Sequence, residues 1–439
     1  MPTSNALAIA VLANLAVIST AQHVVVQTDL APAGPGGAAQ GLVDGRGYLT
    51  TSIQHGIDAR TGKLVAGGAT AQMTQAMSNI AAVFAAAGRD LATSGASCWI
   101  YGFNASTFGD ISAAYYTFFP AMHHYHPARN PTGATLILDG ALVGVSCRGF
   151  SQGGVRVAPP NFFASDLNAQ GLLVDGGAHL FTSAQLGANP ISGNLVAGGA
   201  VNETRQALSN IAVVFAAAFP RLGRTALSRR ASECQLIIVN DTASGVASVW
   251  QAVEREYART FAGGPAPAMS ITGFPVGALP IPAHVAVTCN GVGDRVSRTV
   301  LGGGVVARVG STTQLQASAE LGEDVNATFA ATAAVFAEAF PYLAHELGTR
   351  APSKGSLLPK ESAVAILQAT ATECQLWLAD PAADVAAALA SLSSLFIEKA
   401  PRGLRPHLPP LTVTKAALPS TGGTSQLVAL QCFGSDTKK

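Results

Sequence analysis

The side chains best suited to chemistry lie in two short stretches of the first half of the chain. His123, His124 and His126 could offer imidazole nitrogens to a metal ion, but no spaced cysteine, aspartate or glutamate completes a ligand set. Ser151, within GFSQG, fits a G-x-S-x-G nucleophile elbow, which needs a strand before it and a helix after it. The residues that follow, GVRVAPPNFF, are typical of a linker and a strand. We therefore expect neither a metal site nor a serine nucleophile here.

Six cysteines fall into three pairs with matching surroundings. In each pair the first cysteine opens an apolar, strand-like run, and the second closes another run inside a Cys-x-Gly ending. This repetition favours the pairing in which each third of the chain joins its own two strands. The expected disulfides are Cys98 with Cys147, Cys234 with Cys289, and Cys374 with Cys432. The alternative is six buried thiols in a reducing compartment.

The first residues predict export. Residues 6–18 form an apolar run broken only by Asn14 and are followed by small residues, so we predict a signal peptide over residues 1–21, although Lys and Arg are missing before the run. A first strand is the alternative, but the run is rich in Ala and Leu, and a strand-like pattern starts only at His23. We expect a protein that is secreted or held in the lumen of a secretory organelle.

Four Asn-x-Ser/Thr sequons are compatible with that route, with chance occurrence as the alternative. They are Asn104, Asn202, Asn240 and Asn326. Only 12% of the residues are charged and the formal net charge is +1, so no basic face indicates nucleic acid as a partner. The apolar run at the start is too short to span a bilayer, and no other segment reaches the necessary length of about 18 apolar residues.

The elements that would position a site repeat along the chain. Residues 64–88 and 195–219 are identical at 17 of 25 positions, and a third, diverged copy, VFAEAFP, begins at Val335. The chain is therefore interpreted as one supersecondary unit used three times. The expected units are residues 22–152, 153–291 and 292–434, the third being the most diverged, with a disordered tail at 435–439.

Each unit is predicted to contain two or three strands, a helix, a strand, a second helix and two closing strands. In the first unit the long helix follows the break at Gly67 and Gly68, the second helix covers 105–119, and the closing strands cover 134–138 and 142–147. Helices are also expected near 202–219, 246–261, 327–340 and 385–399. Two helices on one face of a mixed sheet make an α+β unit whose other face is apolar and would be covered most economically by the next unit.

The order of five short motifs in the first unit resembles the Rid family, the YjgF-type reactive intermediate deaminases. The motifs are GPGG (34–37), TSIQ (51–54), TG (61–62), QMTQAMSNI (72–80) and PAR (127–129). The second unit keeps TSAQ (182–185) and TRQALSNI (204–211), whereas the third keeps mainly its helices and strand endings. The resemblance implies a chorismate-mutase-like fold that ordinarily forms a homotrimer with clefts between subunits. Three such units on one chain imply a monomer with an internal pseudo-threefold axis, an intrachain pseudo-trimer.

The resemblance also implies which residues could act. In the family the arginine of PAR binds the substrate carboxylate, and Arg129 matches this arginine. Ser52 or Ser183 would line the same cleft. A glutamate on the last strand is associated with the attacking water, but Gly144, Ala286 and Ala429 take its place. The arginine is replaced by Pro267 in the second unit and by Leu408 in the third, where Arg405 is an imperfect substitute, and Gly36 replaces the tyrosine of the GPY loop.

The resulting expectation is a protein that binds a small carboxylate or a protein partner and has largely lost the family's hydrolysis of imines and enamines, which needs neither a metal nor an organic cofactor. An active 2-imino acid deaminase that uses the single Arg129 cleft is the first alternative. A structural subunit of a larger assembly is the second.

Overall fold

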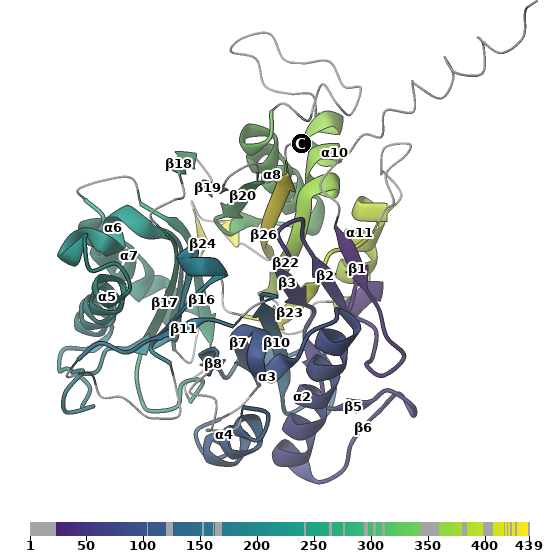
Figure 1. Cartoon of the computed structure of the whole chain (residues 1–439), viewed down its shortest axis with the longest axis horizontal. Helices are drawn as coiled ribbons and strands as arrows, with labels where there is room; N and C mark the ends of the chain where they lie inside the picture. The colour runs from purple at the N-terminus through teal and green to yellow at the C-terminus, as the bar shows by residue number, and fades with distance from the viewer. Residues whose placement is uncertain are drawn as a thin grey trace, which may run out of the picture.

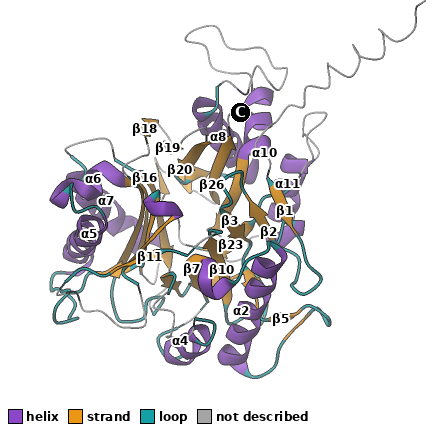
Figure 2. Ribbon diagram, viewed as in Figure 1, coloured by secondary structure: helices purple, strands orange, loops and turns teal. Residues whose placement is uncertain are grey.

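The computed structural model describes most of the chain after the first 22 residues. The described residues are 23–102, 104–119, 126–151, 153–160, 162, 169–240, 243–262, 266–274, 277–293, 297–301, 304–309, 312–341, 343, 360–379, 384–397, 407–416, 418, 420–421, 424–425 and 428–437. The predicted signal peptide, His123 and His124 lie outside them. Figure 1 shows the long helices on the outside of the molecule and the strands toward its centre, and Figure 2 shows the same division by element type.

The first sheet has seven strands in the order β1-β2-β3-β10-β7-β8, with β4 also paired to β10. Strands β7 and β8 run parallel and the other pairs are antiparallel, so the sheet is mixed. The elements of this region are β1 (Val24–Val26), β2 (Gly41–Val43), β3 (Leu49–Thr51), β4 (Gln54–His55), β5 (Ile57–Asp58), β6 (Lys63–Leu64), α2 (Gly68–Ala86), α3 (Leu91–Ser94), β7 (Gly95–Tyr101), α4 (Phe108–Tyr116), β8 (Ala128–Thr132), β9 (Thr135–Leu136) and β10 (Gly144–Gly149).

The second sheet repeats this order strand for strand as β11-β12-β13-β17-β15-β16, with β14 paired to β17. Its elements are β11 (Val155–Val157), β12 (Gly171–Val174), β13 (His179–Thr182), β14 (Gln185–Leu186), α5 (Gly199–Ala218), α6 (Ala226–Arg230), β15 (Ala231–Val239), α7 (Ala243–Thr260), β16 (Ala268–Phe274) and β17 (Val285–Val292).

The third sheet repeats the order again as β18-β19-β20-β26-β22-β23, with β21 paired to β26, and gains β9 of the first unit as an eighth strand. Its region contains β18 (Ser297–Leu301), β19 (Gly304–Val309), β20 (Thr312–Ala317), β21 (Glu320–Gly322), α8 (Val325–Ala339), α10 (Lys360–Thr370), β22 (Ala371–Leu378), α11 (Val385–Ile397), β23 (Leu411–Lys415), the hairpin β24 (Ser420–Thr421) and β25 (Thr424–Ser425), and β26 (Val428–Thr437). The expected disordered tail is wrong for residues 435–437, because β26 continues to Thr437 and pairs with β20.

The backbone conformation explains why both copies of the LVAGGA stretch contain a pair of glycines. Gly67 and Gly68 precede and begin α2 at φ 109° and 74°, and Gly198 and Gly199 do the same for α5 at 100° and 68°. Side chains with a Cβ rarely adopt such angles, so both copies need glycine at the turn into the helix. Helix α2 then buries an apolar face formed by residues such as Met73, Ile80 and Phe84.

The Cys-x-Gly endings are explained by the same helices. A Cβ built on Gly149 would lie 2.5 Å from Phe84 of α2, and one on Gly291 would lie 2.5 Å from Phe215 of α5. In the third unit Gly434 meets Phe336 of α8 at the same distance. Each phenyl ring therefore packs directly on the backbone of the central strand, which requires a residue without a side chain.

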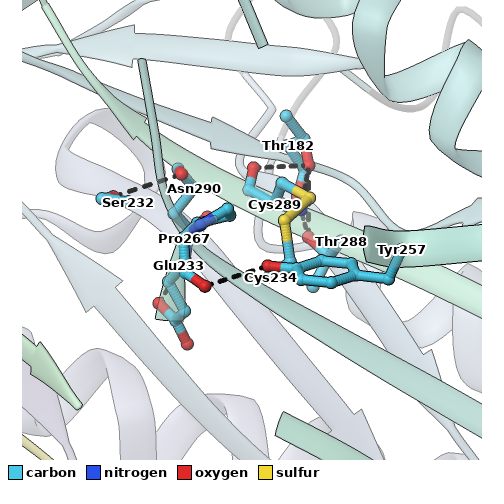
Figure 3. The surroundings of a disulfide bond; sticks show 9 residues. All are labelled: Thr182, Ser232, Glu233, Cys234, Tyr257, Pro267, Thr288, Cys289 and Asn290. Carbon is cyan, nitrogen blue, oxygen red and sulfur yellow. Dashed lines mark hydrogen bonds between the residues drawn. A yellow bond between two sulfur atoms is a disulfide. The ribbon is translucent and has the colours of Figure 1, made fainter. Parts of the chain in front are cut away.

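Each unit contains the expected disulfide across two neighbouring antiparallel strands. Cys98 is bonded to Cys147, Cys234 to Cys289 and Cys374 to Cys432. The paired cysteines are direct register partners with Cα atoms 4.1–4.2 Å apart, and all six are buried. Figure 3 shows the second disulfide, beside which the Thr182 hydroxyl accepts a hydrogen bond from the Cys289 amide at 3.0 Å. The three bonds fit an oxidising compartment.

The inner faces of the three sheets pack against one another. Trp99, Ile237 and Trp377, from the corresponding strands β7, β15 and β22, belong to one buried apolar cluster. The helices cover the opposite faces, where each unit has its own core. The second face of each sheet thus contributes residues to one shared apolar cluster.

Charged residues are also buried between the units. Arg148 of β10 donates from Nε to Glu373 of β22 at 2.8 Å, and its Nη1 lies 3.9 Å from Glu233 of β15. All three side chains are at most 6% exposed. Burial raises the pKa of Glu233, opposed by the charge of Arg148.

Several boundaries differ from the expected ones. The closing strand expected at 134–138 is reduced to β9, which joins the third sheet, while the strand next to β7 lies earlier, at Ala128–Thr132. Among the described helices, no single one is long and apolar enough to cross a membrane. One bent pair of described helices, Gly199–Ala218 and Gly223–Arg230, passes by length and composition, and α5 buries its apolar face in the core of the second unit.

Candidate ligand pocket

Arg129 and Ser183 meet where the first two units touch. Arg129 is the second residue of β8 and lies opposite Cys98 of β7. Its amide donates to the Ser183 hydroxyl at 2.9 Å, and its carbonyl accepts from the Ala184 amide at 3.2 Å. The Ser183 hydroxyl in turn donates to the Ala169 carbonyl. The TSAQ segment of the second unit is thus fixed against the backbone of the arginine.

The same pair of hydrogen bonds recurs at the other two contacts between units. Met269 of β16 donates to the Ser318 hydroxyl at 3.1 Å and accepts from the Ala319 amide at 3.2 Å. Leu411 of β23 donates to the Ser52 hydroxyl at 2.8 Å and accepts from the Ile53 amide at 3.2 Å. Ser52 therefore belongs to the contact between the third and first units, and only Ser183 accompanies Arg129.

These contacts correct the sequence alignment of the arginine. Met269 and Leu411 are register partners of Cys234 and Cys374, just as Arg129 is the partner of Cys98. They, and not Pro267 and Leu408, occupy the arginine position. The number of residues between the two paired strands differs from unit to unit, so short motifs alone misplaced the register. Arg405 lies outside the described residues.

The Arg129 guanidinium is held by helix α4. Its Nη1 donates to the Ser112 hydroxyl at 3.0 Å, and its central carbon lies 5.1 Å and 5.0 Å from the ring centroids of Phe108 and Tyr116. Cation–π contacts of this kind orient a guanidinium and contribute about 0.5–2 kcal/mol each. The residue is only 8% exposed, so its charge acts in surroundings largely shielded from water.

Arg129 and Ser183 line a cavity of about 340 Å³ between the first two units. The polar lining residues besides these two are Gln170, Gln185, Asn189 and Asn210. The apolar ones are Phe108, Pro131, Phe162, Ala184, Leu186, Ala188, Pro190, Gly193, Leu279, Pro280, Ile281 and Ala286. Sequence reasoning found Arg129, Ser183 and Ala286 but missed the rest; Gln185, which ends TSAQ, and Asn210, which lies in SNI, could have been found from the same motifs.

Two carboxamides of the pocket, those of Gln185 and Asn210, are hydrogen-bonded to other groups of the protein. Gln185 donates to the Gln170 side chain at 2.8 Å. Asn210 donates to the carbonyls of Leu186 and Ala188, and its oxygen accepts from Gln206. These hydrogen bonds hold the two carboxamides in place. Arg129 is the one charged side chain among the described lining residues.

The position of the expected catalytic glutamate is apolar. Ala286 lines the pocket from β17, and none of the described lining residues is Asp, Glu or His. In the first unit a Cβ on Gly144 would lie 2.6 Å from Ile53. At the tyrosine position of the GPY loop, Gly36 has φ 62°, and a Cβ built on it would lie 3.2 Å from Leu389 of α11.

The other candidate groups do not form a site. His126 is buried beside Tyr116, and the described residues contain no group of three or more His, Cys, Asp or Glu side chains that could hold a metal ion. The element described after Ser151 is strand β11, so no helix follows it as a nucleophile elbow requires. Of the sequons, Asn104 and Asn326 are exposed, whereas Asn202 and Asn240 are partly buried.

The topology and the pocket at the contact between units define a Rid-like class of protein. The family model described as Endoribonuclease L-PSP matches residues 31–148. The 2-iminobutanoate/2-iminopropanoate deaminase of Rattus norvegicus is 32% identical over 124 residues, which cover 27% of this chain and 88% of the rat protein. The chain therefore belongs to the Endoribonuclease L-PSP family, the Rid/YjgF proteins.

Solved structures match a similar share of the chain. The YjgF gene product of E. coli is 25% identical, with 29% of this chain and 99% of that chain covered and a TM-score of 0.27. RidA from the Antarctic bacterium Psychrobacter sp. PAMC 21119 is 26% identical, with 29% and 98% covered and a TM-score of 0.26.

Proposed function

We propose that this chain is an intrachain pseudo-trimer that binds a small carboxylate in the pocket between its first two units and has largely lost imine hydrolysis. The observation that carries the proposal is the meeting of Arg129 and Ser183 in one cavity whose glutamate position is Ala286. A guanidinium suits a carboxylate because its fork can donate two parallel hydrogen bonds.

The loss of hydrolysis follows from the pocket wall. General-base catalysis requires a group that can take a proton from water and return it, usually a carboxylate or an imidazole. The described lining residues offer amides, one hydroxyl and a guanidinium, and none of these is a base near neutral pH. A bound ligand would therefore be retained rather than converted.

Calorimetric titration with 2-oxobutanoate tests the binding proposal. We expect saturable binding that Arg129→Ala abolishes and Arg129→Lys weakens, since lysine keeps the charge but loses the fork. Arg60→Ala is the matched control, because the Arg60 side chain is 88% exposed and pairs only locally with Asp58. Binding that survives Arg129→Ala unchanged would refute the proposal.

An active 2-imino acid deaminase is the second candidate, favoured by the likeness to the rat deaminase. Its test is a coupled assay in which an amino-acid oxidase generates the imine and ammonia release is measured. Hydrolysis above the uncatalysed rate that disappears in Arg129→Ala would establish this candidate. A rate equal to that without the protein would leave the binding function.

We also propose that the protein passes through the secretory pathway and is glycosylated. Three disulfides and the exposure of Asn104 and Asn326 support this. Amino-terminal sequencing of material from its native source should begin after residue 21. Glycosidase treatment should lower the mass, most readily through Asn104 and Asn326.

A further inference from the structure

The composition of the pocket wall restricts the ligand beyond the presence of a carboxylate. We infer that the pocket takes a monocarboxylate with a branched or aromatic apolar tail, larger than a four-carbon acid. This inference rests on the proposed function, because it assumes that Arg129 receives the carboxylate.

The cavity is large for a four-carbon ligand. Its volume of about 340 Å³ lies within the range of roughly 300–1,000 Å³ typical of pockets for drug-sized molecules. A small acid held at Arg129 would leave much of this space without contacts. A longer tail would fill it and gain affinity from each apolar group removed from water.

The polar and apolar groups suit the two ends of such a ligand. Arg129 is the one charged side chain among the described residues that line the pocket, and the amides of Gln185 and Asn210 already bond to the protein. The remaining wall is mainly hydrocarbon and includes Phe162 and Leu186. A second carboxylate or a phosphate would lose its water without a compensating charge.

Two exposed isoleucines lie at the pocket or beside its lining residues. Ile281 lines the cavity and is still 36% exposed, and Ile191, between the lining residues Pro190 and Gly193, is 72% exposed. A tail that extends from Arg129 toward these isoleucines would cover apolar surface that otherwise faces water. The charge of the guanidinium and the hydrocarbon of the isoleucines together indicate an amphipathic ligand rather than a purely apolar one.

Calorimetric titration of the full chain with a graded series of 2-oxo acids tests the inference. The probes are 2-oxobutanoate, 4-methyl-2-oxopentanoate, phenylpyruvate and the dicarboxylate 2-oxoglutarate. Each buried methylene should tighten binding roughly fourfold, so the branched and aromatic acids should bind at least about tenfold more tightly than 2-oxobutanoate. The dicarboxylate should bind no better than 2-oxobutanoate.

Variants of exposed isoleucines separate this inference from the proposed function. Ile281→Ser should weaken phenylpyruvate several-fold more than it weakens 2-oxobutanoate. Ile397→Ser, at a similarly exposed position on α11 of the third unit, should affect neither acid. Equal affinity for all monocarboxylates, or a tighter dicarboxylate, would overturn the inference alone. Binding of no acid at all would overturn both the inference and the proposed function.

Discussion

At the scale of single residues, Arg148 is expected to affect stability strongly. Its guanidinium is buried between Glu373 and Glu233, which belong to the third and second units. Arg148→Met leaves two buried carboxylates without a cation, and breaking a buried ion pair in this way costs about 3–5 kcal/mol. The urea midpoint of unfolding should fall accordingly.

The matched variant removes the charges together. Arg148→Met combined with Glu233→Gln and Glu373→Gln should recover most of the lost stability, because no uncompensated charge then remains buried. A triple variant as unstable as Arg148→Met would show that shape, rather than charge, is what the guanidinium contributes.

His179 gives the stability a dependence on pH. Burial, and then the charge of Arg46, lower the pKa of His179 to about 3, and its Nε2 accepts from Arg46 Nη1 at 2.6 Å. An unfolded histidine has a pKa of about 6.5. Between pH 6.5 and pH 3 the unfolded chain therefore binds more protons at this residue than the folded chain does. The contribution of neutral His179 to the free energy of unfolding is therefore complete above pH 6.5. It is lost progressively as the pH falls from 6.5 toward 3.

The variant His179→Gln keeps an acceptor for Arg46 but cannot titrate. We expect the thermal midpoint of this variant to decline less between pH 6.5 and pH 4 than that of the natural chain. Parallel declines in the two proteins would mean that His179 does not hold its neutral form in the folded state.

At the scale of elements, the packing of α2 on β10 leads to a prediction about glycine. Gly149→Ala would place a Cβ 2.5 Å from the Phe84 ring and 2.8 Å from the Ser94 carbonyl. Overpacking of this kind costs about 1–3 kcal/mol. Gly109→Ala in α4 is the control, since no atom lies within 4 Å of its Cβ, and it should stabilise the helix by about 0.5–1 kcal/mol. Chemical denaturation of both variants decides the matter.

Sequence patterns predicted the elements that depend on local rules. The repeated Gly-Gly entry gave both long helices of the first two units, and the Cys-x-Gly endings gave the strand pairs joined by disulfides. Strand β8 was missed because ARNPT is polar and contains Pro131, although all five residues are buried. The pairing of β9 with β23 joins residues almost 280 positions apart, and no local pattern encodes such a contact.

The sequence predicted individual residues of the pocket but not the way in which they come together. Arg129 follows from its motif, but two serines were equal candidates, because the choice between them depends on which unit lies next to β8. That order is a property of the tertiary structure, and it selects Ser183. The apolar lining was not predicted, since Phe162, Leu186 and Ile281 lie in separate parts of the chain.

At the scale of the whole molecule, the three units are not interchangeable. Residues that occupy the same register position differ between them: Ser97 corresponds to Glu233 and Glu373, and Arg148 corresponds to Asn290 and Phe433. One arginine thus serves two glutamates, and its guanidinium also lies 4.7 Å from the Phe433 ring. Three copies of the second or third unit around one axis would bring three glutamates together without a cation, which burial makes unfavourable.

The contacts between the three units predict the mass of the protein in solution. Each unit contacts the next through a corresponding serine hydroxyl, in the order first to second (Ser183), second to third (Ser318) and third to first (Ser52). The ring of contacts is closed within one chain and leaves no copy of that contact for another chain. Light scattering should therefore give a mass near that of a single chain, 44.4 kDa before any processing or glycosylation, independent of concentration. A stable trimer of chains would contradict the pseudo-trimer, because it would require the contacts to be shared between molecules.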